Sequence, residues 1–275
     1  MKERLDVRMV REALTPTREK ARRLILERRV LVDGVAAEKA GTPVSESAEI
    51  TILGEVSPFV GRGGQKLAKV LDAYGLSLEG QICMDVGAST GGFTDCMLQH
   101  GAERVYAVDV GSGQLAEKLL ADPRVVNVEH TNVRYLKPLH FGVPMDFVSM
   151  DVSFISVTKL LSAVAAQMRP GAQLVCLIKP QFEAGRSALD KHGIVVRQKP
   201  VHVQVLARVL ACAESSGFAA LHLDVSPITG RDGNIEYLLH ARREDGAAES
   251  ISAQETERVV DEAFLYHCQS GKGRK

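Results

Sequence analysis

The sequence predicts an α/β protein in which a mostly parallel sheet of seven strands follows a small α+β module. Two observations lead to this fold class. From about residue 66 onward, short apolar runs alternate with helix-like stretches, which is typical of parallel strands covered on both faces. The first 55 residues instead combine short amphipathic helices with brief β runs. We therefore expect a module at 1–55, a linker at 56–65 and a larger domain at 66–275.

Composition excludes several classes of protein. With 275 residues, 45% of them hydrophobic and 25% charged, the chain is typical of a globular protein. The five cysteines are widely spaced, so we expect free thiols and no metal site. We find no signal peptide, and no apolar run approaches the ~20 residues that cross a bilayer. We therefore expect a cytoplasmic protein that does not contact a membrane.

The first 30 residues carry a local positive charge, although the formal net charge of the whole chain is zero. Ten basic side chains stand there against five acidic ones. We predict a short helix that ends near Leu14 and a second helix that starts at Thr15-Pro16, with proline at its first position. Short β runs around the turn signal Asp33-Gly34 and a strand at 49–53 complete the module.

The spacing of the arginines places Arg18, Arg22 and Arg29 on one basic stripe beside the apolar face of the second helix. Clustered arginines bind phosphates and position a nucleic acid without reading its bases. A solvated basic face on a small helical cap is the alternative. We favour contact with RNA, and the candidate residues, one of them in the linker, are Arg4, Arg18, Lys20, Arg22, Arg23, Arg29 and Arg62.

Seven candidate strands define the larger domain, with helical stretches between most of them. The candidate strands are Ile82–Val86, Val105–Val108, Val125–Val128, Phe147–Met150, Leu174–Ile178, His222–Val225 and Ile235–Leu239. We also expect helices at Lys66–Tyr74 and 251–267. Ligands of such sheets bind beyond the carboxyl ends of the parallel strands, so polar residues at those ends are candidate site residues.

A glycine-rich turn follows the first of these strands and opens a helix. Its spacing, G-x-x-x-G-G from Gly87, differs from the G-x-G-x-x-G that seats the pyrophosphate of a dinucleotide. S-adenosylmethionine fits better, because it has no phosphate and Asp85 can face its cationic end. Asp109 can accept hydrogen bonds from both ribose hydroxyls, and Asn132 can contact the adenine. Packing glycines in an ordinary α/β turn are the alternative.

The predicted cofactor site combines this turn with residues at three further strand ends. Its members are Asp85, Gly87, Ala88, Ser89, Thr90, Gly91, Gly92, Phe93, Asp109, Val110, Asn132 and Asp151. A nicotinamide-dependent oxidoreductase would need the other glycine spacing, so the sequence disfavours that class of enzyme.

Charged side chains at the strand ends form the candidate catalytic set. Asp151 and Lys179 each follow a buried strand, Glu236 lies in the last candidate strand, and Lys66 lies where the linker enters its helix. A ribose hydroxyl is a poor nucleophile until a base takes its proton, and a lysine can do so if burial and a neighbouring cation lower its pKa. We predict that Lys179 is the base and that Asp151 and Glu236 orient it. Lys66 would steer the RNA or tune the electrostatic field at the site. Strand-end salt bridges and a solvated helix lysine are the alternatives.

The residues after the fourth strand also bear on the substrate. Methyltransferases of exocyclic amines typically carry an Asn/Asp-Pro-Pro-aromatic string there. This chain has Asp151-Val152-Ser153-Phe154 instead, which argues against methylation of an amine.

Strings along nearly the whole chain carry a family resemblance. RLDV at 4–7 and the stretch Lys20–Gly34 resemble an S-four-type RNA-binding domain. The others are GRGGQKL at 61–67, DVGASTGGFTD at 85–95, MDVSFIS at 150–156, IKPQFE at 178–183, HGIVVR at 192–197 and SPITGRDGNIEYL at 226–238. Together they resemble the TlyA-type family, whose members are named hemolysin A or ribosomal-RNA cytidine-2′-O-methyltransferase, and more distantly the FtsJ-like RNA ribose methyltransferases.

This resemblance implies a Rossmann-like, S-adenosylmethionine-dependent methyltransferase that modifies a cytidine ribose in ribosomal RNA, free or in a ribosomal subunit. It also implies a Lys-Asp-Lys-Glu catalytic set at Lys66, Asp151, Lys179 and Glu236. The chain departs from the family at Gly61, where serine is frequent, and at Gln65, where leucine is frequent.

Two further functions are alternatives. A membrane-active hemolysin would need an insertable helix or hairpin, or an amphipathic surface segment, and we find none. A non-catalytic protein that binds RNA or the ribosome would not need both the cofactor turn and the four charged residues. The sequence leaves open the modified nucleotide, the choice between naked RNA, subunit and whole ribosome, and the oligomeric state.

Overall fold

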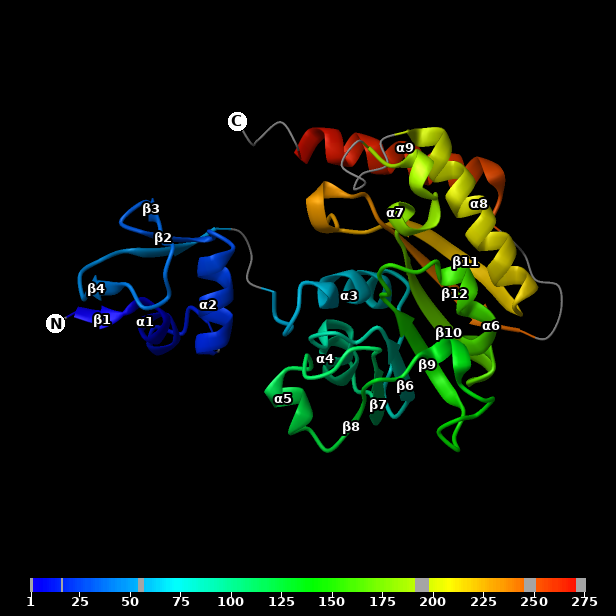
Figure 1. The fold of residues 1–275 in the computed structure, drawn as a ribbon, viewed down its shortest axis with the longest axis horizontal. Helices are drawn as coiled ribbons and strands as arrows, with labels where there is room; N and C mark the ends of the chain where they lie inside the picture. Colours follow the sequence, from blue (N-terminus) through cyan, green and yellow to red (C-terminus); the bar gives the residue numbers. More distant parts are fainter. Residues whose placement is uncertain (1, 16, 54–56, 191–197, 245–250, 271–275) are drawn as a thin grey trace. The chain divides into compact units, whose positions relative to one another are not determined.

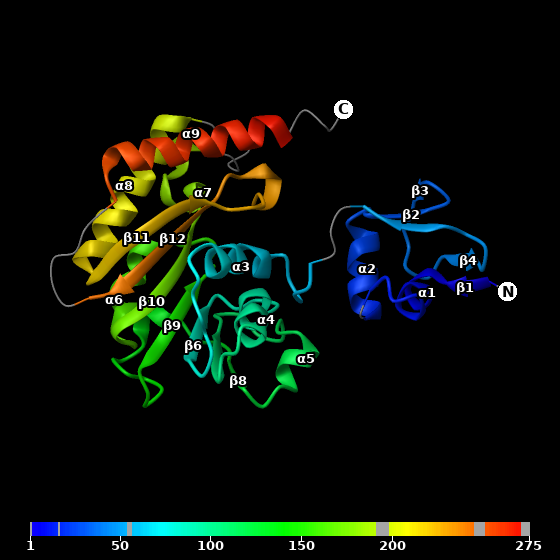
Figure 2. The same ribbon diagram turned by 180° about the vertical axis from the view of Figure 1, so that it is seen from behind.

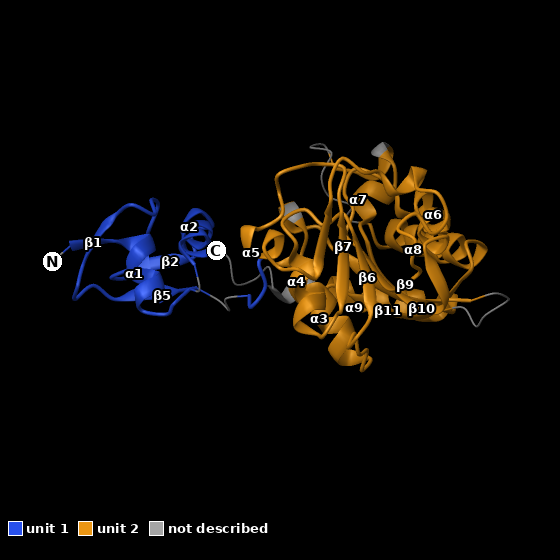
Figure 3. Cartoon of the chain, turned by 90° about the horizontal axis from the view of Figure 1, so that it is seen from below, with its two compact units in different colours: residues 1–60 blue, residues 61–275 orange. Residues whose placement is uncertain are grey.

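The computed structural model describes residues 2–15, 17–53, 57–190, 198–244 and 251–270. Contacts divide the chain into a first unit, residues 1–60, and a second unit, residues 61–275 (Figure 3). Each unit has an apolar core of its own. Pro16 and the string at 192–197 lie outside the described residues.

The first unit packs two helices against short antiparallel strands. Leu5 and Met9 of the first helix bury their side chains against Leu24 and Ile25 of the second. A sheet with the order β3-β2-β5 and a separate β1-β4 pair complete the unit. The elements are β1 (Lys2–Arg4), α1 (Leu5–Arg11), α2 (Arg18–Leu26), β2 (Val30–Val32), β3 (Val35–Ala36), β4 (Pro43–Ser45) and β5 (Ile50–Ile52).

The bounds of α2 differ from those the sequence predicts. Its N-cap is Thr17, whose side chain accepts a hydrogen bond from the backbone N of Lys20 at 3.1 Å, and this cap sets the start of the helix. The helix ends at Leu26, so Arg29 lies outside it and does not share a stripe with Arg18 and Arg22. Strands β1 and β4 escaped prediction because three residues carry too little alternation to mark a strand.

In the described part of the second unit, seven strands form one sheet, as the sequence predicts. Their order is β11-β12-β10-β9-β6-β7-β8. The strands from β6 to β10 run parallel, whereas β12 runs antiparallel to both of its neighbours. The strands are β6 (Ile82–Val86), β7 (Arg104–Val108), β8 (Val125–Val128), β9 (Met145–Met150), β10 (Met168–Ile178), β11 (Phe218–Val225) and β12 (Tyr237–Arg243).

Helices flank this sheet (Figures 1 and 2). Figure 3 shows α6 and α8 across the sheet from α3 and α4, while α9 contacts α8 and β11. The helices are α3 (Gly63–Ala73), α4 (Gly92–Gln99), α5 (Glu117–Leu120), α6 (Leu161–Ala165), α7 (Pro180–Glu183), α8 (Lys199–Ser215) and α9 (Ala253–Ser270). Short 3₁₀ helices are η1 (Val133–Tyr135), η2 (Val157–Lys159), η3 (Arg186–Ala188) and η4 (Arg231–Gly233).

Two element bounds in the second unit bear on the site. Helix α3 begins at Gly63, three residues before the expected start, so Lys66 lies within its first turn. The last strand begins at Tyr237 and not at Ile235. Glu236 therefore lies just before a strand, at the point where the antiparallel β12 enters the sheet.

Candidate active site

Four charged side chains meet at the carboxyl edge of the parallel strands. Asp151 directly follows β9, and Lys179 directly follows β10. Because β12 is antiparallel, its amino end lies at the same edge, where Tyr237 pairs with Ile178. Glu236 precedes that pair, and Lys66 of α3 reaches it. The structure thus brings together all four residues of the predicted catalytic set.

Short ion pairs link these four side chains. Lys66 Nζ lies 2.6 Å from Glu236 Oε2 and 4.0 Å from Asp151 Oδ2. Lys179 Nζ lies 2.5 Å from Asp151 Oδ1 and donates a hydrogen bond to Ser153 Oγ at 2.9 Å. Asp151 therefore stands between the two lysines. Two lysines face two carboxylates, which balances the formal charge of this lysine–carboxylate cluster (Lys66, Asp151, Lys179 and Glu236).

Burial makes this balance important. Lys66, Lys179 and Glu236 are buried, while the side chain of Asp151 is 22% exposed. Removing one partner of a buried ion pair typically costs ~3–5 kcal/mol, because the other charge is left without compensation. Asp151 also lines an adjacent cavity, so the lysine–carboxylate cluster opens toward that cavity through its aspartate.

Glycines shape the turn between β6 and α4. Gly87 has a φ of 83°, in the left-handed region that favours glycine. A Cβ at this position would lie 2.7 Å from the backbone O of Asp151, so only glycine lets the turn pack this closely against Asp151. Gly91 has a φ of 90° and starts α4, and a Cβ there would lie 2.2 Å from Leu119 Cδ1.

A cavity of about 410 Å³ opens beyond this turn, within the ~300–1,000 Å³ that is usual for small-molecule sites. The predicted cofactor residues that line the cavity are Gly87, Ser89, Asp109, Val110, Asn132 and Asp151. The sequence interpretation missed several others, which lie on loops or at a short 3₁₀ helix: Gly111, Gln114, Thr131, Val133, Ile155 and Leu160.

Asp109 and Asn132 have the polar groups that a nucleoside needs. Asp109 Oδ2 accepts a hydrogen bond from Ser89 N at 2.8 Å, and its Oδ1 accepts one from Gly111 N at 2.7 Å. Each carboxylate oxygen keeps a further lone pair for a ribose hydroxyl. The Oδ1 of Asn132 accepts from Arg134 N at 3.0 Å, which leaves its Nδ2 as the group that can donate to a ligand. The cavity therefore fits S-adenosylmethionine.

Asp85 does not line the cavity, which corrects its predicted contact with the cationic end of the cofactor. The side chain is fully buried, its Oδ2 accepts from Thr94 N at 2.8 Å, and its Oδ1 accepts from Ser149 Oγ at 3.1 Å. Burial raises the pKa of Asp85 to about 7. Strand alternation is the reason: Val86 faces the cavity, so its neighbour Asp85 faces the opposite side and anchors α4.

Five other predicted cofactor residues also stand behind the described lining of the cavity, where they shape the turn and the start of α4: Ala88, Thr90, Gly91, Gly92 and Phe93. Gly61 packs directly onto this turn. A Cβ at position 61 would lie 3.1 Å from Thr90 Oγ1 and 3.3 Å from Gly92 Cα, so this departure from the family relieves a tight contact.

The predicted RNA-binding residues fall into three groups. Arg4, Arg18 and Arg22 converge on one aspartate of the first unit, and Arg62 is exposed at the N-cap of α3 in the second unit. Arg23 and Arg29 each donate to a backbone carbonyl of the first unit. The third group is a single lysine with a different environment.

Lys20 is the residue of this set whose prediction the structure corrects. Its side chain is turned into the first unit, and only 9% of the residue is exposed. The Nζ donates to the backbone O of Ser57 at 3.1 Å and of Phe59 at 2.8 Å. The ammonium group therefore ties α2 to the following segment instead of meeting a phosphate.

Two side chains near the cavity, Phe154 and Glu183, were not among the predicted site residues. Phe154 is 89% exposed at the rim of the cavity and has a φ of 65°, which is rare for an aromatic residue. Its ring centroid lies 5.1 Å from that of Phe182. Glu183 is buried, and it accepts from Ser156 Oγ at 2.6 Å and from Val157 N at 2.8 Å, so it holds the loop that carries Phe154. The strings MDVSFIS and IKPQFE contain Phe154, Phe182 and Glu183 and were the available signal.

Comparison with known families identifies both units. Residues 3–50 match the S4 domain, and residues 59–243 match the FtsJ-like methyltransferase family. The chain belongs to the FtsJ-like methyltransferase family. It is therefore a methyltransferase, its methyl donor is S-adenosylmethionine, and its Rossmann-like fold behind an S4 domain is the one that the sequence predicts.

Similar proteins match this FtsJ-like methyltransferase over nearly its whole length, which confirms the resemblance to the TlyA-type family. The "Putative rRNA methyltransferase YqxC" of Bacillus subtilis (strain 168) is 45% identical, over 95% of this chain and 94% of the relative. The "16S/23S rRNA (cytidine-2'-O)-methyltransferase TlyA" of Mycobacterium tuberculosis is 38% identical, over 95% and 97%. A solved "Putative hemolysin from Streptococcus thermophilus" has a TM-score of 0.79 and 42% identity, over 98% of both chains.

Three further observations concern the other predicted properties. Among the residues that the structure describes, none of the helices has the length and apolar character to span a membrane. The described residues also contain no group of three or more His, Cys, Asp or Glu side chains placed to hold a metal. Cys83, Cys96 and Cys176 are free and buried, and burial raises the pKa of their thiols, which is typical of inert cysteines.

Proposed function

We propose that this methyltransferase modifies the 2′-oxygen of a ribose, most readily that of a cytidine, in ribosomal RNA. The observation that carries the proposal is the lysine–carboxylate cluster at the wall of the cofactor cavity, because a ribose hydroxyl needs a proton acceptor before it can attack a methyl group. The named activity of the Mycobacterium tuberculosis relative supports cytidine and ribosomal RNA as the substrate. Such a substrate places the enzyme in the cytoplasm.

Lys179 is the proposed proton acceptor. A lysine nitrogen makes up to three hydrogen bonds, and Asp151 and Ser153 occupy two of these directions in the structure. The third direction is left for the substrate hydroxyl. Bound S-adenosylmethionine supplies an electrophilic methyl group. Once Lys179 has lost a proton to solvent, its nitrogen can take the hydroxyl proton while the ribose oxygen bonds to the methyl carbon and the methyl–sulfur bond of the cofactor breaks. Asp151 then stabilises the ammonium that forms.

Lys66 and Glu236 position Asp151 in this proposal. Lys66 Nζ lies 2.6 Å from Glu236 Oε2 and 4.0 Å from Asp151 Oδ2, the oxygen that does not contact Lys179. The buried pair therefore fixes the orientation of the carboxylate that contacts Lys179. Because Lys66 is buried, this positioning role fits better than the direct steering of RNA that its place near the linker predicted.

Phe154 and Phe182 provide an aromatic surface beside the lysine–carboxylate cluster. Lys179 Nζ lies 5.9 Å from the Phe182 ring, and the exposed Phe154 ring lies next to it. A ribose inside a stacked helix is hard to reach, and enzymes that act on single nucleotides commonly turn them out of the stack. An exposed aromatic ring can then stack on the displaced base, which contributes about 1–3 kcal/mol per base.

The test is transfer of a labelled methyl group from S-adenosylmethionine to naked ribosomal RNA and to ribosomal subunits. Lys179→Ala should lower the rate by about 10²–10⁴-fold, the usual contribution of a general base, while cofactor binding is retained. Lys199→Ala is the control, because Lys199 is half exposed and neither it nor its partner Asp261 lines the cavity. If the wild type binds the cofactor but labels no RNA, the proposed substrate is wrong.

A further inference from the structure

Three arginines of the first unit converge on one buried carboxylate. Asp6, in the first turn of α1, has no exposed surface. Arg4 binds it through two hydrogen bonds, from Nε to Oδ1 at 2.9 Å and from a terminal nitrogen to Oδ2 at 3.0 Å. Arg18 and Arg22, one turn apart on α2, donate to Oδ2 at 3.1 Å and 3.2 Å.

This arrangement leaves positive charge at the surface. The side chains of Arg4, Arg18 and Arg22 are each about half exposed, at 50%, 50% and 53%. One carboxylate balances only one of the three guanidinium charges. Hydrogen bonds from Arg4, which has the largest effect, and from Arg18 and Arg22 hold the pKa of Asp6 well below its usual range. Asp6 therefore stays ionised at neutral pH.

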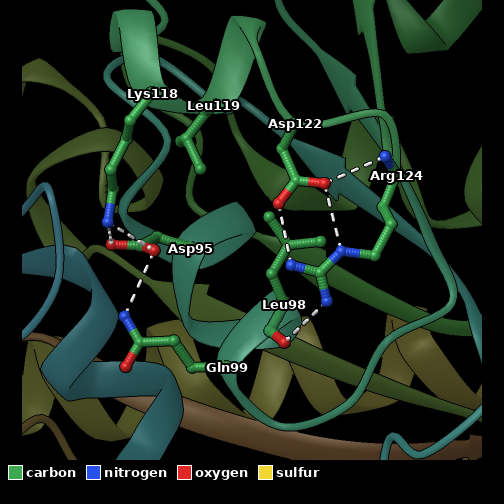
Figure 4. A pocket seen from close by; sticks show the side chains of 7 residues that line it. All are labelled: Asp95, Leu98, Gln99, Lys118, Leu119, Asp122 and Arg124. Atoms are coloured by element: carbon green, nitrogen blue, oxygen red, sulfur yellow. Dashed lines mark hydrogen bonds and ion pairs between the residues drawn. The ribbon is translucent and has the colours of Figure 1, made fainter.

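A polar pocket of the second unit shows the contrasting case. Lys118 lies 2.9 Å from Asp95, and Arg124 lies 2.7 Å from Asp122, on two sides of the pocket (Figure 4). Each cation there has a carboxylate of its own, so the pocket offers no excess charge to an anion. The group around Asp6 differs because three cations share one partner.

We propose that Asp6 assembles Arg4, Arg18 and Arg22 into a site for a backbone phosphate of RNA. The inference rests on the proposed function, in that RNA is the expected ligand. A guanidinium has five N–H donors, and Asp6 engages only one or two on each arginine. The remaining donors belong to three guanidinium groups that are held around one carboxylate, and such a group of donors suits the several oxygens of a phosphate.

Asp6 is a positioning residue in this site. Three neighbouring guanidinium groups repel one another, and without a shared partner their long side chains would spread apart. Holding the groups in place before binding lowers the conformational entropy lost when a phosphate arrives. Phosphate contacts of this kind fix the orientation of a protein on RNA without reading its sequence.

The decisive variant is Asp6→Asn in the full chain, because two explanations predict opposite signs. If the arginines act only through total charge, removing a negative charge strengthens RNA binding. If Asp6 positions them, affinity for a fluorescein-labelled RNA hairpin falls by on the order of tenfold. The salt dependence of binding also weakens, because fewer phosphates are held. Glu3→Gln is the control: Glu3 pairs with Arg11 at 3.1 Å, so the same charge is removed nearby without touching the site.

A second set of variants keeps the test sharp if Asp6→Asn does not fold. Arg18→Gln and Arg22→Gln replace half-exposed side chains, and if both hold one phosphate, the double variant should lose little more affinity than either single variant. Additive losses, or a folded Asp6→Asn protein that binds RNA as tightly as the wild type, would overturn the inference. So would binding to phosphatidylserine vesicles in place of the hairpin. Failure of the proposed function is distinct, because it appears as missing methyl transfer by the wild type.

Discussion

The lysine–carboxylate cluster of the second unit and the arginines around Asp6 in the first unit differ in charge balance and in exposure to solvent. In the lysine–carboxylate cluster at the cavity, two lysines face two carboxylates, and the side chains are mostly buried. Around Asp6, three half-exposed arginines share a single carboxylate. Balanced, buried charges fix reacting groups in place, because each charge needs its partner. Unbalanced charges at the surface remain attractive to a polyanion.

Breaking the charge balance of the lysine–carboxylate cluster should have the largest effect on the rate of methyl transfer. Glu236→Gln leaves Lys66 without its closest carboxylate, so Lys66 should draw Asp151 away from Lys179. A displacement of about 1 Å can lower a rate by about 10²-fold. We expect a loss of this order in the rate of methyl transfer at saturating S-adenosylmethionine, together with a drop of ~3–5 kcal/mol in the free energy of unfolding.

Stability and catalysis can be separated at this pair. Adding Lys66→Met to Glu236→Gln removes the uncompensated charge, so the free energy of unfolding should recover while methyl transfer stays low. Lys199→Ala, which breaks an exposed pair, should change neither quantity appreciably. Full recovery of activity in the double variant would show that Lys66 and Glu236 only stabilise the fold.

Asp109 extends the comparison to a carboxylate that has backbone N–H groups as partners in place of a cation. Asp109→Ala removes the proposed acceptor for the ribose hydroxyls, and hydrogen bonds to a charged group are worth about 1.5–3 kcal/mol. The dissociation constant for S-adenosylmethionine, measured by calorimetry, should rise by about 10–100-fold. Asp122→Ala, which breaks a pair with Arg124 away from the cavity lining, should leave it unchanged.

A variant at Phe154 tests whether RNA also binds through an uncharged aromatic surface at the rim of the cavity. Phe154→Ala should raise the KM for ribosomal RNA by about tenfold, since base stacking is worth about 1–3 kcal/mol, and it should leave cofactor binding intact. Phe154→Trp should restore most of the loss. An unchanged KM for RNA in the alanine variant would remove Phe154 from the substrate site.

The smallest expected effect concerns Asp85, a buried carboxylate held by hydrogen bonds from Thr94 and Ser149. Burial raises its pKa in the folded protein to about 7, from the 3.8 that is usual for an aspartate in water. The folded state therefore holds this proton more tightly, so the contribution of Asp85 to stability falls as the pH rises from about 4 to about 7. The Tm advantage of wild type over Asp85→Asn should shrink between pH 5 and pH 8. An advantage that is equal at both pH values would contradict the raised pKa.

Much of the fold followed from the sequence because buried parallel strands read as apolar runs. The strands β6, β7 and β8 begin and end within one residue of their predicted bounds. The short β1 and β4 carry no such pattern, because each contributes only three residues. The start of β12 was misplaced because Ile235 continues its apolar run, although the strand begins only at Tyr237.

Site residues could be predicted where the sheet topology alone places them at the cavity. They were harder to predict where the direction of the side chain decides whether it reaches the cavity. Asp151 and Lys179 follow strand ends, so their meeting could be inferred from the sheet. Asp85 also lies near a strand end, but pleating turns it away from the cavity. The exposure of Phe154 and the burial of Lys20 depend on contacts with distant segments, which periodicity does not encode.

The most direct test of the central claim is to locate the methyl group that the enzyme transfers to ribosomal RNA. Alkali cleaves RNA through the 2′-hydroxyl, so a nucleotide methylated on its 2′-oxygen resists cleavage at the following phosphate. We predict that the label survives alkaline hydrolysis in dinucleotides, and that Lys179→Ala yields almost none. Label recovered in mononucleotides would place the methyl group on a base and contradict ribose methylation.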